Sequence, residues 1–407
     1  MHFPGILNRL AEAEDSVCML QSSSLSPVNG NSCMKYNAAM RSWKRIAVCV
    51  LFFLAVRGVA TVGAEPQSPD GTQQFADFGD FKLRNGSVIH DFRIGYRTLG
   101  QLNTDKSNAI LWPTWLGGTS QDLLQFIGPG NVLDSSKYYV VLVDAIGNGV
   151  SSSPSNSQEQ PRMRFPRFGI RDMVEAEHRL VTDVLHLSHL RAVMGISMGG
   201  MQTFSWVMAY PDFMDVAIPI TGSPQSTSYD KLLWTAEIDA IESDPAWNHG
   251  NPSKPLTKGI ALVEEIDGMN STSPAYRVAH TDAKGFEAFL SEIRSNAQAD
   301  GGVASNQIRQ RQAIIFFDAP KEFGMTLAQS AKRVRAKLLV IISPQDHMVN
   351  PTPAMKMAAE AGFPVVTLNS ACGHLSLTCI SVGPTVARFL AEPSSVHSVT
   401  FEDQANP

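Results

Sequence analysis

The chain has 407 residues, of which 43% are apolar, and it carries a formal net charge of −5. This length allows one large or two ordinary domains, and the composition is that of a globular protein. The slightly acidic balance gives no reason to expect nucleic acid as a partner, and the lack of repeats and charge runs argues against a binding array.

A secretory signal sequence is the first predicted feature. Residues 40–45 are rich in basic side chains, residues 46–56 form an apolar run of eleven, and residues 62–64 (Val-Gly-Ala) are a small-residue cleavage site. Because the apolar run is shorter than the roughly 20 residues of a membrane span, we expect no stable membrane anchor. We therefore predict a signal peptide over residues 34–64 and a periplasmic or secreted protein, with an N-terminal anchor as the alternative.

Residues 1–33 precede this segment and lack its character. Because a signal peptide begins a chain, we expect the native product to start at Met34 or Met40, without residues 1–33. The globular part of the protein is then expected from residue 65 onward.

Strands and helices alternate over residues 65–222. Asn85-Gly86 is a two-residue hairpin signal between short β-rich runs. Apolar residues at helical spacing predict an amphipathic helix over residues 171–187. This alternation indicates a mostly parallel sheet that is covered by helices on both faces. Buried strands are expected at residues 109–112, 138–143, 190–194 and 216–220.

The most informative segment is the motif at residues 195–200, Gly-Ile-Ser-Met-Gly-Gly. It follows the predicted strand 190–194 and precedes residues 201–208, which indicate a helix. A G-x-S-x-G turn between a strand and a helix resembles the nucleophile elbow of the α/β-hydrolases, in which the serine hydroxyl stands clear of the backbone. We therefore predict Ser197 as a nucleophile on an α/β-hydrolase fold.

Residues 223–332 interrupt the alternation of strands and helices. They are richer in polar residues and helix formers, with scattered apolar positions such as Trp234 and Trp247. We interpret them as a helical cap inserted into the sheet domain. The core is expected to resume over residues 333–407, with strands at 336–342 and 365–368, a closing helix at 382–392 and a loose tail after Pro393.

A base and an acid follow Ser197 in the chain order that this fold requires, serine, then aspartate or glutamate, then histidine. Asp346 comes just after the predicted strand 336–342, and His374 comes just after the strand 365–368. Both would lie at the sheet edge that presents Ser197. His374 would take the serine proton and Asp346 would orient the imidazole. The alternatives are a loop-capping role for Asp346 and an ordinary buried polar role for His374.

An oxyanion hole needs two backbone N–H groups that point at the developing negative oxygen. Met198, directly after the nucleophile, is expected to supply one of them. The loop after strand 109–112 is expected to supply the other, from Leu116, with Trp115 as the near alternative. An ordinary glycine turn is the competing interpretation of this loop.

No histidine is spaced with a second ligand in the manner of a metal site, so we predict neither a metal nor another cofactor. If residues 1–64 are absent from an exported product, Cys372 and Cys379 are its remaining cysteines. Export favours a disulfide between them. Two helical turns would hold them too far apart to bond, so two buried thiols remain the alternative.

The chain resembles the homoserine O-acetyltransferase family of α/β-hydrolases over about residues 75–392. The most specific match is the run from Gly195 to Gln202 with Tyr210-Pro211 downstream, and residues 108–111 and 244–247 support it. The resemblance implies Ser197, Asp346 and His374 as the catalytic triad, with Leu116 and Met198 as oxyanion donors. It also implies a helical cap that is often used for homodimer contacts.

Two positions depart from the acetyltransferase pattern. The family typically carries an aspartate directly after the catalytic histidine, where this chain has Leu375, and an arginine where this chain has Ile238. The family uses those charges to hold the amine and the carboxylate of homoserine. An amino acid entering a pocket that Trp115, Ile238 and Leu375 line would leave its charges unpaired.

These observations predict an exported serine hydrolase that acts on small-molecule carboxylic esters through an acyl-enzyme on Ser197. The first alternative is an O-acyltransferase that passes an acetyl group to an alcohol. The second alternative is a non-catalytic small-molecule binding protein on a hydrolase scaffold, which would have no need for a serine, an acid and a histidine in catalytic order.

Overall fold

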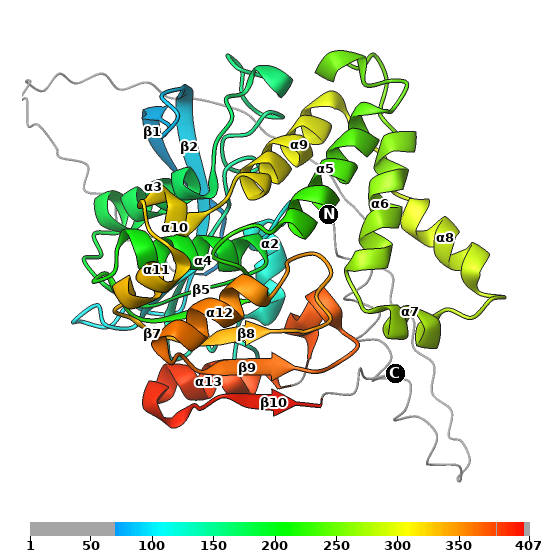
Figure 1. The fold of residues 1–407 in the computed structure, drawn as a ribbon. Helices are drawn as coiled ribbons and strands as arrows, with labels where there is room; N and C mark the ends of the chain where they lie inside the picture. The colour runs from blue at the N-terminus through cyan, green and yellow to red at the C-terminus, as the bar shows by residue number, and fades with distance from the viewer. Residues whose placement is uncertain (1–69, 380, 403–407) are drawn as a thin grey trace, which may run out of the picture. The chain divides into compact units, whose positions relative to one another are not determined.

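The computed structural model of the chain describes residues 70–379 and 381–402 (Figure 1). The expected signal peptide at 34–64 and the preceding residues 1–33 lie outside the described part. Within that part, a ten-stranded sheet is covered by helices on both faces, as an α/β fold requires.

The sheet has the strand order β1-β2-β4-β3-β5-β6-β8-β9-β10, with β7 also paired to β6. The β1–β2 and β2–β4 pairs are antiparallel, and every other pair is parallel. The strands are β1 (Gln74–Lys82), β2 (Val88–Leu99), β3 (Ala109–Pro113), β4 (Tyr139–Val143), β5 (Leu190–Ile196), β6 (Met214–Ile220), β7 (Lys337–Leu338), β8 (Val340–Ile342), β9 (Val365–Leu368) and β10 (Val399–Phe401).

Alternation of side chains along the central strands builds two apolar layers, one on each side of the sheet. In β3, Ala109 and Leu111 face one layer, while Ile110 and Trp112 face the other. Strands that are buried on both faces read as continuous apolar runs, which is why the central strands were predictable. One layer is covered by α3 (Ile170–Arg179), α4 (Met198–Ala209) and α12 (Thr352–Ala361), and the other by α2 (Ser120–Leu123) and α13 (Val382–Ala391).

The predicted cap is mainly helical, with isolated β-bridges at Leu256–Ala299 and Gln225–Asp318, but it ends earlier than expected. Backbone hydrogen bonds from Ser226 N–H to the Phe317 carbonyl and from Ala319 N–H to the Pro224 carbonyl join its two ends. Residues 227–316, called the helical insertion from here on, therefore leave the core and return to it at one place. Its helices are α5 (Ser228–Glu242), α6 (Lys258–Asn270), α7 (Pro274–His280), α8 (Phe286–Arg294) and α9 (Gly301–Ile315).

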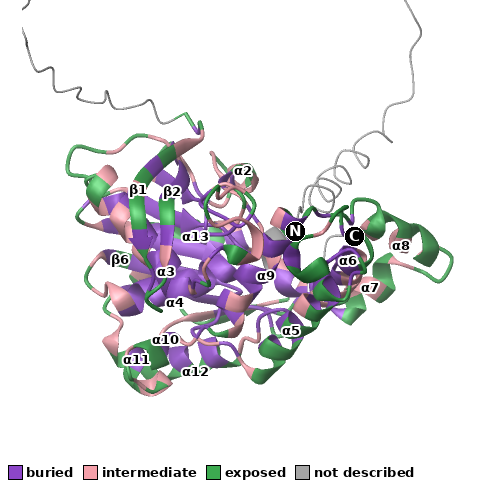
Figure 2. Cartoon of the chain, turned by 90° about the horizontal axis from the view of Figure 1, so that it is seen from above, coloured by how far each residue is buried: buried purple, intermediate pink, exposed green. Residues whose placement is uncertain are grey.

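Residues 317–332, expected in the cap, instead cover the core. The short helices α10 (Ala319–Glu322) and α11 (Leu327–Arg333) bring Ala319 and Ala331 into the same apolar layer as α4. The helical insertion has a separate apolar cluster, centred on Ile241, Trp247 and Ile308. In Figure 2, α4 has the colour of buried residues, whereas α8 of the insertion has no buried residue.

The described part of the tail, residues 394–402, has regular structure, whereas a loose segment was expected. Val399–Phe401 form β10, which pairs in parallel with β9 at the edge of the sheet. Val396 is buried, and Phe401 packs against the layer that α13 covers. These apolar residues are few among serines and threonines, and the pairing of β10 with β9 places them against the core.

Among the helices of residues 70–379 and 381–402, none has the length and apolar character of a membrane span.

Candidate active site

Ser197 occupies a strained turn between β5 and α4. Its φ of 57° and ψ of −123° lie outside the regions that a side chain ordinarily allows, and its amide donates a hydrogen bond to the Ile220 carbonyl of the adjacent strand at 2.9 Å. The residue is only 8% exposed. The turn therefore holds Ser197 at the carboxyl end of the central strand, in the manner of a nucleophile elbow.

Glycines permit this turn because the backbone segments around it nearly touch. A Cβ on Gly195 would lie 2.4 Å from the Gly199 backbone, and one on Gly199 would lie 2.6 Å from the Pro113 carbonyl oxygen. A Cβ on Gly200 would lie 2.9 Å from the Cα of Gly222. The glycines of the motif thus allow α4 to start directly against β3 and β6.

Ser197, His374 and Asp346 form a continuous hydrogen-bonded chain. His374 Nε2 lies 2.8 Å from Ser197 Oγ, and His374 Nδ1 lies 2.8 Å from Asp346 Oδ2. All three residues are buried. An imidazole held in this way can accept the serine proton at Nε2 while the carboxylate stabilises the cation that results.

The loop after β8 orients Asp346 through its own backbone. The amides of Met348 and Val349 donate to Asp346 Oδ1 at 2.9 and 2.8 Å, so Oδ2 is left to face His374. The amide of Asn350 donates to Oδ1 of Asp230, a fully buried residue at the start of α5, at 2.8 Å. Burial raises the pKa of Asp230, although hydrogen bonds from the Asn350 and Thr227 amides lower it in part. The helical insertion thereby supports the loop of the acid.

The loop of His374 is paired with the turn between α6 and α7. Leu375 N–H donates to the Ser271 carbonyl at 3.2 Å, and Ser273 N–H donates to the Ala371 carbonyl at 3.1 Å. Gly373 has a φ of +58°, and a Cβ there would lie 3.0 Å from Ser273 N. Glycine before the histidine thus allows the insertion to approach the histidine loop closely.

The predicted oxyanion donors, Leu116 and Met198, belong to two segments that a side-chain hydrogen bond joins. The side chain of Gln202 in α4 donates to the Thr114 carbonyl at 3.0 Å, which joins the elbow helix to the loop after β3. The amides of Leu116 in that loop and of Met198 after Ser197 have no acceptor within the described part of the chain. Because an open N–H group can bind a developing oxyanion, Leu116 and Met198 remain the predicted donors.

The predicted pocket residues have different surroundings. Trp115 is buried in the layer that α13 covers, with its ring edge-on to Phe126. Ile238 lies on α5 and packs, half-buried, against the apolar cluster of the helical insertion, so the structure gives it a packing role there. Leu375 is half-buried directly after His374. Of these three residues, Leu375 is the one that adjoins the triad in the chain.

Cys372 and Cys379 are two thiols in the structure rather than a disulfide. Cys379 is buried, and its Sγ lies 3.3 Å from Ser370 Oγ. Residues 70–379 and 381–402 contain no cluster of three or more side chains that could hold a metal ion.

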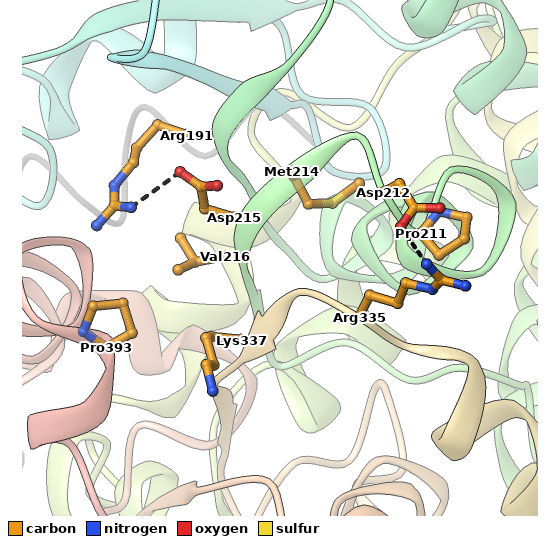
Figure 3. Close-up of a pocket in the computed structure, with 9 residues that line it drawn as sticks. All are labelled: Arg191, Pro211, Asp212, Met214, Asp215, Val216, Arg335, Lys337 and Pro393. Carbon is orange, nitrogen blue, oxygen red and sulfur yellow. Dashed lines mark hydrogen bonds and ion pairs between the residues drawn. The ribbon is translucent and has the colours of Figure 1, made fainter.

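A pocket lies at the amino ends of the central parallel strands (Figure 3). Arg191 at the start of β5 pairs with Asp215 at 3.1 Å, and Arg335 pairs with Asp212 at 2.8 Å. The length of β5, at about 3.3 Å per residue, separates this pocket from Ser197. Because both arginines already have carboxylate partners, we assign no chemistry to this pocket.

A mostly parallel sheet of this order, with a serine elbow after its central strand and an acid and a histidine after later strands, defines the α/β-hydrolases. Comparison with known proteins refines the class. The chain is 40% identical over 335 residues to a probable esterase of Corynebacterium glutamicum, which covers 78% of this chain and 93% of the relative. An ethyl acetate hydrolase of Pseudomonas veronii is 33% identical over 322 residues, covering 75% of this chain and 90% of that protein.

The acetyltransferases are similar as well. A homoserine O-acetyltransferase of Methanohalobium evestigatum is 33% identical over 304 residues, covering 66% of this chain and 61% of that protein. Among solved structures, the acetyl esterase MekB has a TM-score of 0.73 at 28% identity and covers 79% of this chain and 97% of its own. No family model matches the chain. The chain belongs to the family of α/β-hydrolase enzymes that contains these esterases and the homoserine O-acetyltransferases.

Sequence reasoning missed the residues through which the insertion contacts the site. These are Asp230, the Ser271–Ser273 turn and Gln310, whose side chain accepts a hydrogen bond from the Gly117 amide. Thr227 and Asp230 form a capping box, which signals only the start of a helix. The other contacts leave no local pattern in the sequence.

Proposed function

We propose that the protein is a serine hydrolase that cleaves small carboxylic esters, acetyl esters among them. The hydrogen-bonded chain from Ser197 through His374 to Asp346, set at a strained elbow, is the observation that carries this proposal. The names of the esterase relatives, an ethyl acetate hydrolase and an acetyl esterase, support a short acyl group.

The geometry accounts for both halves of the reaction. As Ser197 Oγ attacks the ester carbonyl carbon, its proton passes to His374 Nε2 over the 2.8 Å hydrogen bond. The carbonyl oxygen becomes an oxyanion, which the Leu116 and Met198 amides stabilise. His374 then gives its proton to the departing alcohol, which leaves an acyl-enzyme. A water molecule that loses a proton to His374 attacks the acyl carbon, and the carboxylic acid departs as Ser197 recovers its proton.

An O-acyltransferase is the second candidate, and membership of this family favours it. The two activities share the acyl-enzyme and differ in whether water or an alcohol attacks it. Leu375 beside His374 argues for water as acceptor over homoserine, because an apolar side chain there cannot pair with an ammonium group.

The test is hydrolysis of p-nitrophenyl esters of graded acyl length by the wild type and by Ser197→Ala. We expect turnover of the acetyl ester by the wild type and its loss by about 10⁶-fold in the variant, with an unchanged thermal melt. Unchanged turnover in Ser197→Ala would remove the mechanism. In single-turnover deacylation, free acetate supports the esterase, whereas O-acetylhomoserine formed from added homoserine supports the acyltransferase.

We also propose that the protein is exported with cleavage after Ala64. The proposal rests on the basic, apolar and small-residue pattern of residues 40–64, which lies outside the described residues. Cell fractionation and N-terminal sequencing are the measurements. A mature chain that starts at Glu65 outside the cytoplasm is expected, and a cytoplasmic protein with residue 2 intact would contradict export.

A further inference from the structure

The loop that carries the Leu116 amide is a tight turn. Gly118 N–H donates to the Trp115 carbonyl at 3.1 Å, and Gly117 between them has a φ of +71°. A hydrogen bond over three residues with glycine at positive φ in the third position is the pattern of a type II turn. The central peptide of such a turn, here the Leu116–Gly117 peptide, can rotate and so convert the turn to another type. A contact that fixes this peptide therefore fixes the turn.

Gln310 of α9 holds this peptide. Its Oε1 accepts the Gly117 N–H at 2.8 Å, and its Nε2 donates to the Ile146 carbonyl at 3.0 Å. The side chain is 1% exposed, so both of its polar ends are used within the protein. Buried amides with both ends satisfied have one orientation, which makes Gln310 a rigid bridge between two loops of the core.

Both peptide units that flank Leu116 are therefore fixed by hydrogen bonds. The Trp115 carbonyl, which shares a peptide plane with the Leu116 amide, accepts from Gly118, and the following peptide donates to Gln310. Oxyanion donors act by being oriented before the charge develops, and small misplacements weaken them strongly. An anchor on the peptide next to Leu116 thus bears directly on the transition state.

We propose that Gln310 is a positioning residue for the oxyanion hole, a role that rests on the proposed hydrolase function. Through it, the helical insertion supplies part of the transition-state stabilisation rather than only covering the site. Other contacts attach α9 to the core independently. Arg309 donates to the Phe165 and Met163 carbonyls, and Asn306 bonds both polar groups of Ser155.

The test compares Gln310→Met with Gln312→Met in the same helix. Methionine keeps the length of the side chain but removes both hydrogen bonds, whereas Gln312 loses only a bond from Arg309. We expect Gln310→Met to lower kcat for p-nitrophenyl acetate by about 10-fold or more, with KM within about twofold of wild type, because the hole binds only the transition state. Gln312→Met should match the wild type in kcat, KM and thermal melt. Gln310→Met should melt at a lower temperature, because the Gly117 amide and the Ile146 carbonyl lose their buried partner, but it should remain folded at the assay temperature.

The rate at which a fluorophosphonate labels Ser197 is a second measurement, which a purely structural role of Gln310 would leave unchanged. The phosphoryl oxygen of this probe uses the same donors, so the rate of Ser197 labelling should fall in Gln310→Met by the same factor as kcat. Equal labelling and equal kcat in Gln310→Met and wild type would overturn the role of Gln310 alone. A wild type that neither labels nor hydrolyses would overturn the proposed function and this role with it.

Gln310→Glu tests the same role without a change of shape, should the methionine variant fold poorly. A neutral carboxyl can accept from Gly117 and donate to Ile146, whereas an ionised one cannot donate and places a negative charge near the oxyanion. We expect the ratio of Gln310→Glu to wild-type kcat/KM to rise as pH falls from about 8 to about 5. A ratio that does not change with pH would contradict the proposal.

Discussion

At the scale of single residues, Glu177 stands out among the buried acids. Its side chain is enclosed between α3 and α4, where Trp206 Nε1 donates to Oε2 at 2.6 Å. Its Oε1 has no partner within residues 70–379 and 381–402. Burial raises the pKa of Glu177 to about 8, although the Trp206 hydrogen bond lowers it in part. A pKa of about 8 favours the neutral form of Glu177 at pH 7.

We predict that Glu177→Gln stabilises the protein at alkaline pH. Between the unfolded pKa of 4.5 and the folded pKa of about 8, the folded state keeps a proton that the unfolded state has lost. The free energy of unfolding then falls as pH rises, by up to about 1.4 kcal/mol per pH unit. Glutamine keeps the acceptor for Trp206 and does not titrate, so it removes this loss.

Thermal melts across this pH range measure the effect. Near pH 4.5 the variant and the wild type should have the same melting temperature. As the pH rises toward 8, the melting temperature of the variant should exceed that of the wild type by a growing margin. Glu360→Gln, at an exposed residue of α12, is the matched control. Its melting temperature should differ from that of the wild type by the same amount at every pH. A melting difference for Glu177→Gln that does not grow with pH would show that the glutamate is already ionised.

At the scale of elements, the short strand β10 supports the segment that leads to His374. Asn369 N–H donates to the Phe401 carbonyl at 2.9 Å, and Asn369 Nδ2 donates to Glu402 at 2.7 Å. At the start of β9, Val365 N–H donates to Ser398 Oγ at 3.0 Å. Residues 398–402 thus border β9 along its length, just before the histidine loop.

We predict that deleting residues 397–407 costs both stability and activity. Loss of these few hydrogen bonds, at about 1 kcal/mol each, should lower the free energy of unfolding by roughly 2–4 kcal/mol. It should also lower kcat, because Asn369 no longer fixes the start of the histidine loop. Thermal melts and ester hydrolysis measure the two effects, and deletion of 403–407 alone is the control. Equal activity in both truncations would contradict the link between β10 and His374.

The elements that the sequence predicted best are those whose own residues determine them. The strands at 109–112 and 365–368 and the closing helix at 382–392 agree with β3, β9 and α13 to within one residue. A continuous run of apolar residues, or apolar residues at helical spacing, indicates in each case that the element is buried. β10 was missed because three residues in a polar tail carry too little pattern, and its partner β9 decides its conformation.

At the scale of the whole molecule, the helical insertion hydrogen-bonds to three loops of the candidate site. Asp230 supports the loop of the acid, the Ser271–Ser273 turn pairs with the histidine loop, and Gln310 holds the loop of Leu116. Two parts of the protein therefore build the site. The core carries the catalytic residues, and the helical insertion positions the loops that hold them.

The sequence by itself determined the fold and the order of Ser197, Asp346 and His374, because the elbow motif and the ends of buried strands are local patterns. Tertiary structure decided how the site is held. The contact of Gln310 with Gly117 spans 193 residues and that of Asp230 with Asn350 spans 120. It also decided that Cys372 and Cys379 are thiols and that residues 399–401 form a strand. Such outcomes depend on which distant segments meet in the folded chain, and no local pattern of residues specifies that.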